Sequence, residues 1–594
     1  MKSKHPVRSR ELLSPIFKFL IILASLSDCS PSLAQQKFPL PDSLHYWIQD
    51  SVLIPTGDGA ILSAVVVGKK GVQSPLPTAF QFSIYSNLSY GLSEAKFAAD
   101  RGYVGVIADA RGKRLSPDNP RPYETEHSDV NAVLDWIVEQ PWSNGEVGMY
   151  GGSYLGFAQW ASLKSPHPAL KTIVPYVAAI PGQGLPMENN IFLLANYQWA
   201  FYVTNNKLLD HGINRDFARW NRLRQAYWNS GAPFSRIDSL DGTPNPWFHC
   251  WLNHPSYDRY WQSMVPYKED FSKIKIPVLS ITGYYDDGQI SAIQYLKDHM
   301  QYNPKAEHYL IIGPYDHFGA QRGGTRELRS YRVDSVALIN THEITYAWLD
   351  YILKGGKKPS ILQDKINFEV MGKNEWKGAA RLDELEPFQS RFYLCQANKG
   401  RTGMLSLQKP SKESMFTQVV DFSGRDSYYF DYYPNPIIKD QIDESTGFLF
   451  TSQPFAQPIS IGGNLKGELG FSINKKDVDV GLILYELTPD GKYFQLSYFM
   501  GRASYMKDPA SRNLLQENRT YRFNFDKSRY FSKQLQPGSR LVVALNIVMN
   551  PFSQINYGTG KDVSLETIRD AGEPLRISWS NLSFIELGSS RKPN

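Results

Sequence analysis

Cysteine is scarce in this sequence. Three cysteines occur in 594 residues, and only Cys250 and Cys395 lie beyond the first 34 positions. We expect these two to fall in different domains, so a disulfide framework is not indicated. No spacing of cysteine and histidine looks like a zinc site, so the sequence gives no support for a structural zinc module.

Runs of like charge are also missing. The formal net charge is +6 at pH 7, and the lysines and arginines form no basic run or stripe. Nucleic-acid binding therefore has little support. The composition, 42% hydrophobic and 21% charged, is ordinary for a soluble globular protein. A chain of 594 residues is too long for one core, so we expect two or three domains.

The one candidate membrane segment is short. An apolar run from Ile16 to Leu26 is broken by Lys18, follows a basic stretch and precedes the small residues Ser32-Leu33-Ala34. This layout predicts a secretory signal over residues 1–34 and export to the periplasm or the exterior, because the run is too short for a confident membrane span. The segment before Cys29 loosely resembles a lipoprotein box, although Asp28 fits it poorly, so lipid anchoring at Cys29 is the alternative form of export.

The mature chain opens with a pattern of short apolar strands that alternate with helical stretches. Tyr103–Ala108 reads as a buried strand, and Glu126–Gln140 has apolar residues at helical spacing. This alternation predicts a parallel sheet covered on both faces, an α/β domain over residues 40–180 and 274–355. Residues 181–273 are rich in Trp, Tyr, Asn and Arg, and we expect them to form a helical cap inserted into that domain.

The pattern changes after a Lys- and Gly-rich linker at 354–359. From residue 360 to 594 the sequence reads as many short strands separated by turns such as Pro489-Asp490-Gly491 and Pro537-Gly538. Regularly spaced short strands of this kind predict a β-sandwich, here of the jelly-roll type. The expected fold is therefore an α/β domain with an inserted helical cap, followed by a C-terminal β-sandwich.

A turn carries the first candidate catalytic residue. Gly151-Gly152-Ser153-Tyr154-Leu155-Gly156 lies between a short apolar strand and a helical stretch. A strand, a sharp glycine-flanked turn with serine and a helix form the context of a nucleophile elbow. The usual motif is G-x-S-x-G, whereas here the last glycine comes one residue later, so a simple Gly-rich turn is the alternative interpretation of these six residues.

Two further residues complete the pattern of a serine hydrolase. Asp286 follows the predicted strand that ends at Gly283, and His317 follows the strand that ends at Gly313. Serine needs a base to take its proton and a third group to orient that base, and in α/β-hydrolases the order along the chain is Ser, acid, His. Asp287 is an alternative acid. Asp316 is too close in sequence to His317 to orient its ring.

With these motifs the chain resembles a known family, the cocaine esterase and X-prolyl dipeptidyl aminopeptidase group of serine hydrolases. The elbow resembles the G-x-S-Y-x-G form of that family, which explains the displaced glycine, and Asp109-Ala110-Arg111-Gly112 resembles its D-x-R-G segment. Tyr285-Asp286 and Gly313-Pro314-Tyr315-Asp316-His317 resemble its acid and base motifs. The resemblance covers the whole mature chain, including the cap and the jelly roll.

The resemblance implies a role for each site residue. Ser153 would attack a carbonyl carbon, His317 would act as the base, and Asp286 would hold the imidazole. The backbone N–H of Tyr154 and the hydroxyl of Tyr85 would hold the oxyanion, with a packed loop aromatic as the alternative for Tyr85. No metal or organic cofactor is needed. The expected partner is a small ester, an amide or a short peptide.

The resemblance does not fix the substrate, because relatives cleave esters, β-lactam-type amides or Pro-containing dipeptides. Recognition of a free α-amino group requires carboxylates near the serine, and here the candidates are Glu188 and Asp287. We expect an exported serine esterase or amidase. The alternatives are an X-prolyl dipeptidyl peptidase, an α-amino acid ester hydrolase and, from another class, a non-catalytic exported protein that binds carbohydrate through its jelly roll. The oligomeric state stays open.

Overall fold

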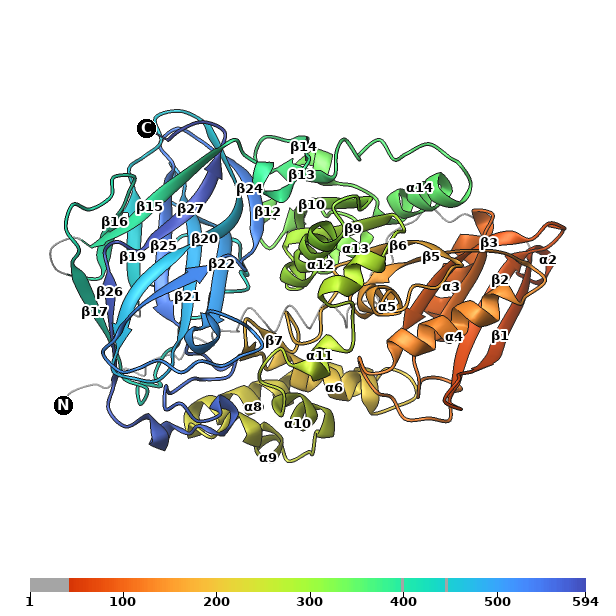
Figure 1. The fold of residues 1–594 in the computed structure, drawn as a ribbon, viewed down its shortest axis with the longest axis horizontal. Helices are drawn as coiled ribbons and strands as arrows, with labels where there is room; N and C mark the ends of the chain where they lie inside the picture. The colour runs from red at the N-terminus through yellow and green to blue at the C-terminus, as the bar shows by residue number, and fades with distance from the viewer. Residues whose placement is uncertain (1–41, 397–399, 444–446, 594) are drawn as a thin grey trace, which may run out of the picture.

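The protein consists of three parts, seen side by side in the computed structural model (Figure 1). The structure describes residues 42–396, 400–443 and 447–593. An α/β domain lies on the right and in the centre of the view, a β-sandwich on the left, and a layer of short helices along the lower edge. The predicted signal segment and Cys29 lie outside the described residues.

The α/β domain contains a ten-stranded sheet that is parallel in its centre and antiparallel at its two ends. The central strands are fully buried because helices cover both faces, which is why their sequences are almost continuously apolar. In spatial order the strands are β1 (Tyr46–Pro55), β2 (Ile61–Lys69), β4 (Val104–Asp109), β3 (Leu76–Ser83), β5 (Ser143–Gly152), β6 (Leu170–Tyr176), β9 (Val278–Tyr285), β10 (His308–Asp316), β13 (Ile366–Val370) and β14 (Glu375–Ala379).

The covering helices follow the periodicity of their apolar residues. In α4 (Glu126–Val138) the side chains of Val130, Val133, Leu134 and Ile137 are buried, at the spacing of one helix face. The side chain of Asn87 accepts a hydrogen bond from Tyr90 N and caps the start of the preceding helix, α3 (Leu88–Asp100). The other helices of the domain are α5 (Tyr154–Ser162), α12 (Gln289–Tyr302), α13 (Gly319–Arg322) and α14 (Thr341–Leu353).

The end of the α/β domain differs from the expected boundary at residue 360. Strand β13 pairs in parallel with β10, and β14 pairs with β13, so residues up to Ala379 belong to the first sheet. The segment Ile366–Val370 is a short buried strand whose sequence is compatible with either sheet, and only its pairing partner decides which one it joins. The linker at 354–359 therefore lies inside the first domain.

Residues 181–273, the proposed cap, are mainly helical. The link of the cap to the α/β domain includes Lys113, whose buried ammonium donates to the carbonyls of Val203, Asn206 and Leu208 at 2.6–3.0 Å. Burial lowers the pKa of Lys113 to about 8. The cap elements are β7 (Met187–Glu188), β8 (Ile191–Phe192), α6 (Ala195–Thr204), α7 (His211–Arg215), α8 (Phe217–Ser230), α9 (Ile237–Asp241), α10 (Pro246–Leu252) and α11 (Arg259–Gln262).

The C-terminal part is a mainly antiparallel β-sandwich built around one long strand. Strand β20 (Ile459–Ile473) contacts four partners along its length and changes register between Gly462 and Lys466. The remaining strands are β15 (Phe388–Gln396), β16 (Thr402–Ser406), β17 (Met415–Val420), β18 (Ile438–Lys439), β19 (Phe448–Ser452), β21 (Asp479–Leu487), β22 (Tyr493–Arg502), β23 (Thr520–Phe525), β24 (Tyr530–Leu535), β25 (Arg540–Ile547), β26 (Leu575–Ser580) and β27 (Phe584–Ser589). The predicted combination of an α/β domain and a C-terminal β-sandwich is confirmed.

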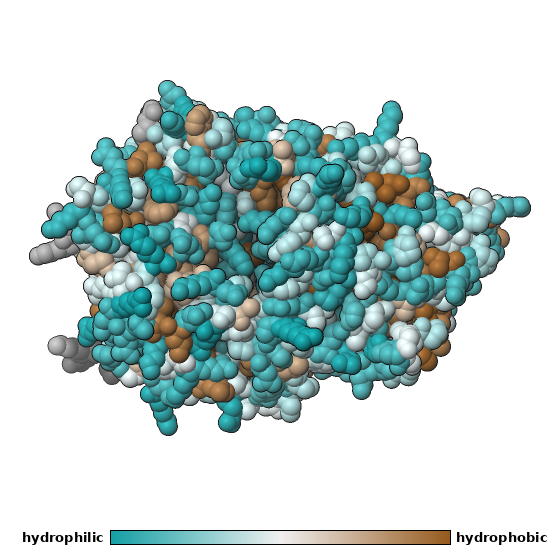
Figure 2. Space-filling view, in the orientation of Figure 1, coloured by the Kyte–Doolittle hydropathy of each residue, from teal (hydrophilic) through white to brown (hydrophobic). Residues whose placement is uncertain are grey.

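The face of the molecule seen in Figure 2 is covered mostly by hydrophilic side chains, with apolar ones in small separate groups. Among the residues that the structure describes, no helix combines the length and the hydrophobicity that a membrane crossing requires. Large apolar side chains instead gather in the interior. Seven tryptophans are buried there: Trp160, Trp220, Trp228, Trp251, Trp261, Trp348 and Trp579.

Candidate active site

The predicted elbow forms a tight turn between strand β5, which ends at Gly152, and helix α5, which begins at Tyr154. Ser153 has φ +61° and ψ −116°, an uncommon backbone conformation for a residue with a side chain. Position 151, two residues before the serine, requires glycine, since a Cβ there would lie 2.7 Å from a methyl carbon of Leu155. The sequence thus forces the serine out of both the strand and the helix and exposes its hydroxyl at the edge of the sheet.

Two hydrogen-bond donors lie beside the serine hydroxyl. Tyr85 follows β3, and its hydroxyl oxygen lies 3.5 Å from Ser153 Oγ. Tyr154 is the first residue of α5, so its N–H has no carbonyl partner within the helix. A hydroxyl group and a backbone N–H beside the serine are the types of donor that can stabilise an oxyanion.

The predicted acid and base are brought together by neighbouring strands. Because β9 and β10 are adjacent and parallel, with Gly283 opposite Gly313, the residues that follow them share one edge of the sheet. His317 Nδ1 lies 2.9 Å from Asp286 Oδ1. The Asp286 carboxylate is fully buried and accepts further bonds from Thr282 Oγ1 at 2.7 Å and from Gly288 N at 2.9 Å. These bonds fix the carboxylate, and the carboxylate fixes the imidazole.

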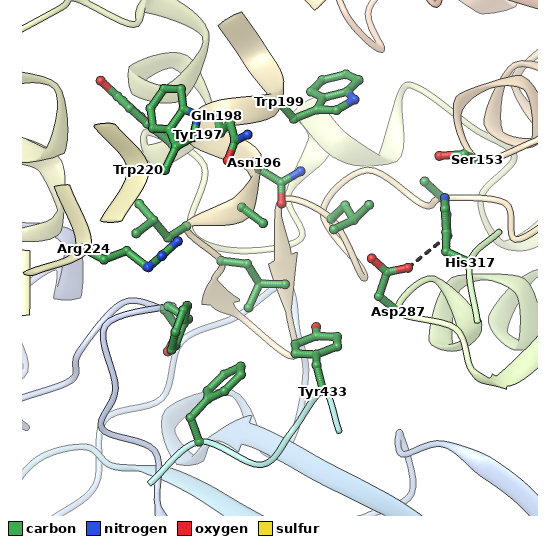
Figure 3. A pocket seen from close by; sticks show the side chains of 18 of the residues that line it. Ser153, Asn196, Tyr197, Gln198, Trp199, Trp220, Arg224, Asp287, His317 and Tyr433 are labelled. Carbon is green, nitrogen blue, oxygen red and sulfur yellow. Dashed lines mark ion pairs between the residues drawn. The ribbon is translucent and has the colours of Figure 1, made fainter. Parts of the chain in front are cut away.

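A second carboxylate contacts the same nitrogen of the imidazole. Asp287 Oδ1 also lies 2.9 Å from His317 Nδ1, and its side chain remains about a quarter exposed. Figure 3 shows the Asp287 side chain beside His317 at the cavity wall. Burial disfavours a charged ring, but the carboxylates of Asp287 and Asp286 outweigh it and raise the pKa of His317 well above its ordinary value.

The same three side chains are a cluster with the donor types of a metal site. Among the described residues, the potential ligand atoms of Asp286, Asp287 and His317 lie within 4.8 Å of one another. However, His317 Nδ1 lies 2.9 Å from both carboxylates, so a proton on this nitrogen would be shared between them. The arrangement suits proton transfer at the other ring nitrogen better than metal ligation through Nδ1.

Ser153 and His317 line a cavity of about 190 Å³ between the three parts of the molecule. The α/β domain supplies Tyr85 and Asp287 to its wall, and the cap supplies residues of α6 and α8. Figure 3 shows Asn196, Gln198 and Trp199 of α6 opposite the His317 edge, with Trp220 and Arg224 farther from Ser153. Three aromatic residues of the cap, Tyr197, Trp199 and Trp220, line the cavity.

The β-sandwich forms the remaining wall, which sequence reasoning missed. Phe430, Tyr433, Met500 and Phe552 line the cavity from loops and strand ends of the C-terminal part. The aromatic run Tyr428–Tyr433 was the one available signal for this contribution. The wall is mostly apolar, so the cavity suits an uncharged, bulky group better than a strongly polar one.

Glu188, a candidate for binding a substrate amine, is placed differently from Asp287. Its buried carboxylate forms a two-point ion pair with Arg529, in which Nη2 lies 2.7 Å from Oε2, and accepts a bond from Tyr433 Oη at 3.2 Å. Arg529 also donates to the carbonyl of Asp287 at 3.1 Å. The cavity wall includes Asp287 but not Glu188, so the charge of Glu188 is neutralised behind that wall.

Comparison with known proteins gives two family matches. Residues 58–319 match the model of the X-Pro dipeptidyl-peptidase (S15 family), and residues 364–570 match that of the X-Pro dipeptidyl-peptidase C-terminal non-catalytic domain. Cocaine esterase from Rhodococcus sp. (strain MB1 Bresler) is 24% identical over 567 residues, which covers 89% of this chain and 95% of that protein.

Solved structures share the whole architecture. An aminopeptidase from a marine sediment archaeon, Thaumarchaeota archaeon, superposes with a TM-score of 0.76 at 20% identity, covering 95% of this chain and 99% of the other. An α-amino acid ester hydrolase superposes with a TM-score of 0.73 at 20% identity, covering 95% and 100%. Both likenesses show a common fold.

Proposed function

The chain belongs to the X-Pro dipeptidyl-peptidase (S15) family of serine hydrolases, and from this premise we propose that it is an esterase or amidase that acts through Ser153, His317 and Asp286. The observation that carries the proposal is the meeting of three separate chain segments at one cavity. The strained turn presents Ser153, the bond to Asp286 fixes His317, and Tyr85 lies beside the serine hydroxyl.

In the proposed acylation step, Ser153 Oγ attacks the carbonyl carbon of the substrate while His317 Nε2 takes the hydroxyl proton. The carbonyl oxygen becomes negatively charged and is stabilised by Tyr154 N–H and the Tyr85 hydroxyl. The bond to the leaving group then breaks, His317 gives its proton to the departing alkoxide or amine, and an acyl-Ser153 ester remains. Asp286 stabilises the imidazolium between the two transfers.

In the proposed deacylation step, a water molecule replaces the leaving group and attacks the acyl-Ser153 ester. His317 takes a proton from this water and later returns one to Ser153 Oγ, which restores the enzyme and releases the acid. The same two donors stabilise the second oxyanion. Every proton in the cycle passes through His317 Nε2, so the protonation of this ring controls both steps.

The first prediction concerns the nucleophile. A fluorophosphonate probe should label the wild-type chain and fail to label Ser153→Ala, because phosphonylation requires the activated hydroxyl. Intact mass spectrometry measures the labelling, and Ser162→Ala, a buried serine in α5, is the matched control. Equal labelling of wild type and Ser153→Ala would refute the assignment of the nucleophile.

The second prediction concerns the substrate. We expect p-nitrophenyl esters of apolar or aromatic acids to be cleaved faster than an Ala-Pro-anilide. The cavity wall is mainly apolar, and Arg529 neutralises Glu188, which leaves Asp287 as the carboxylate among the described residues of that wall. Side-by-side kcat/KM values measure the preference. Faster cleavage of the anilide would favour the second candidate, an aminopeptidase in which Asp287 binds the free amine.

Export is part of the proposal. The basic residues, the apolar run and the small residues before Gln35 support a signal segment, with Cys29 as the alternative lipid-anchoring position. Expression of the full chain in a bacterial host, followed by fractionation and N-terminal sequencing, tests it. A mature chain that begins at Gln35 supports free export, one that begins at a modified Cys29 supports anchoring, and an uncleaved chain in the cytoplasm contradicts both.

A further inference from the structure

Tyr85 is held by a residue of the cap. The indole Nε1 of Trp199, on helix α6, lies 3.1 Å from the Tyr85 hydroxyl oxygen. An indole N–H can only donate, so the Tyr85 oxygen is the acceptor in this bond. The same oxygen lies 3.5 Å from Ser153 Oγ. Tyr85 therefore lies between a fixed donor on one side and the proposed nucleophile on the other.

This contact determines where the Tyr85 proton points. A proton turned toward Trp199 would meet the indole proton, so the phenolic O–H is directed away from the cap, toward the serine and the proposed oxyanion site. A donor that already has its working orientation loses no energy to reorganisation when charge develops. The phenol oxygen also becomes a better donor when it accepts a bond, because successive hydrogen bonds polarise one another.

Trp199 is itself held in place by aromatic neighbours. Its ring stacks on Tyr123, with centroids 5.3 Å apart and an interplanar angle of 17°. Tyr123 N donates to the hydroxyl of Tyr154 at 3.2 Å, and the Tyr123 and Tyr154 rings lie 5.2 Å apart. One cluster of rings thus fixes Trp199 and also contacts Tyr154, the residue whose N–H forms the other half of the proposed oxyanion site.

We propose that Trp199 is a positioning residue for catalysis, which directs the hydroxyl proton of Tyr85 toward the oxyanion. This inference rests on the proposed function. It makes the cap part of the catalytic machinery as well as a wall of the cavity. It also separates two effects of Trp199, since its ring packs against Tyr123 whereas only its N–H acts on Tyr85.

The test removes the N–H and keeps an aromatic ring at position 199. In Trp199→Phe we expect kcat for a p-nitrophenyl ester to fall about fivefold to tenfold, the effect of one neutral hydrogen bond, with KM changed less than about twofold. The rate of fluorophosphonate labelling should fall in parallel. Trp251→Phe is the matched control. Trp251 lies in the same ring cluster, 6.1 Å from Trp199, and its indole nitrogen has no hydrogen-bond partner among the residues that the structure describes.

A double-variant cycle shows whether Trp199 acts through Tyr85. Tyr85→Phe should lower kcat more than Trp199→Phe does, and adding Trp199→Phe to Tyr85→Phe should cause no further loss. If Trp199→Phe destabilises the fold, benzothienylalanine at position 199 replaces the N–H with sulfur and keeps the ring shape.

Two results would overturn the role of Trp199: a loss in kcat no larger than that of Trp251→Phe, or losses that multiply with those of Tyr85→Phe. Failure of the proposed function would be distinguishable, because the wild-type chain would then show neither ester turnover nor labelling at Ser153.

Discussion

At the scale of single residues, His317 is unusual in having two carboxylates at one nitrogen. Asp286 is buried and fixed by Thr282 and Gly288, whereas Asp287 reaches the cavity wall. Both lie 2.9 Å from Nδ1. The two acids therefore share the stabilisation of the imidazolium, but only Asp287 is close enough to the cavity to respond to a bound substrate.

Because both Asp286 and Asp287 contact His317, we expect the pH dependence of activity to change when the charge of either is removed. A base must be neutral to work, so activity rises with pH through the pKa of His317. Because the Asp287 carboxylate raises that pKa, Asp287→Asn should lower it and move the acidic limb of the kcat/KM profile to lower pH. Asp286→Asn should move the limb in the same direction and should also lower kcat at its pH optimum by about 10³–10⁴, since it is the acid that orients the ring.

The pH profiles of the two variants on a neutral p-nitrophenyl ester measure this division of roles, because the substrate itself does not titrate. Asp316→Asn is the control, as Asp316 accepts bonds from Phe318 N and Gly319 N and has no contact with the imidazole among the described bonds. An acidic limb that stays in place in Asp287→Asn would contradict the assigned effect of Asp287.

At the scale of elements, the angle between β5 and α5 depends on one glycine. A Cβ on Gly156 would lie 2.8 Å from Ala178 Cβ and 2.9 Å from Tyr176 O. Backbone atoms cannot move aside as the end of a flexible side chain can. Gly156→Ala should therefore push α5 away from β6 and displace Ser153. We expect a loss of about 1–3 kcal/mol in unfolding free energy and a larger loss in kcat.

Gly91→Ala is the matched control, since Gly91 also lies within a helix and its Cβ would meet Ile107 Cγ2 at an ordinary 3.6 Å. This variant should be neutral or more stable, because alanine favours a helix. Thermal unfolding followed by circular dichroism and ester kinetics compare the two variants. Equal stability and activity of Gly156→Ala and wild type would show that α5 tolerates a shift.

Some elements could be predicted from local sequence patterns and others could not. Ser153, Asp286 and His317 could be placed because each follows a strand whose apolar pattern is strong. The cap, which was expected to be helical, also contains a short hairpin. Strand β7 pairs with β8, and Asn189 and Asn190 adopt φ of +45° and +66° in the turn between them. Asn-Asn suits such a turn, but strands of two residues carry no periodicity.

At the scale of the whole molecule, the β-sandwich holds the acid-bearing loop. Arg529 pairs with Glu188 and donates to Asp287 O. The next residue, Tyr530, exchanges two bonds with the Gln289 side chain, at 2.6 and 3.0 Å. These partners are 241–341 residues apart in the sequence, so no local pattern could have predicted them. The active-site loop is completed by the C-terminal part.

Removal of Arg529 should therefore affect both stability and catalysis. Arg529→Met leaves the Glu188 carboxylate buried and unpaired, which should cost about 3–5 kcal/mol of unfolding free energy. It also removes the bond to Asp287 O, so kcat should fall. Denaturant unfolding and ester kinetics measure the two effects. Arg522→Met is the control, because Arg522 is largely exposed and its pair with Glu468 contributes about 0–1 kcal/mol.

Glu188→Leu/Arg529→Met separates the two effects. Replacing both members of a buried pair with apolar side chains recovers stability but does not restore the bond to Asp287 O. We expect unfolding free energy close to that of the wild type, with kcat still reduced. Full recovery of kcat in the double variant would mean that Arg529 matters only through its charge pair.

The cavity walls come from three parts of the chain, whereas the proposed nucleophile, acid and base come from one. The residues that are proposed to carry out the reaction and those that shape the cavity can therefore change independently. Substitutions in α8 or in the loop Tyr428–Tyr433 reshape the space for the acyl group without touching the strand ends that hold Ser153, Asp286 and His317. Proteins with this architecture can acquire new substrates through substitutions in these two segments. Randomising the same segments is therefore a direct way to engineer the substrate range.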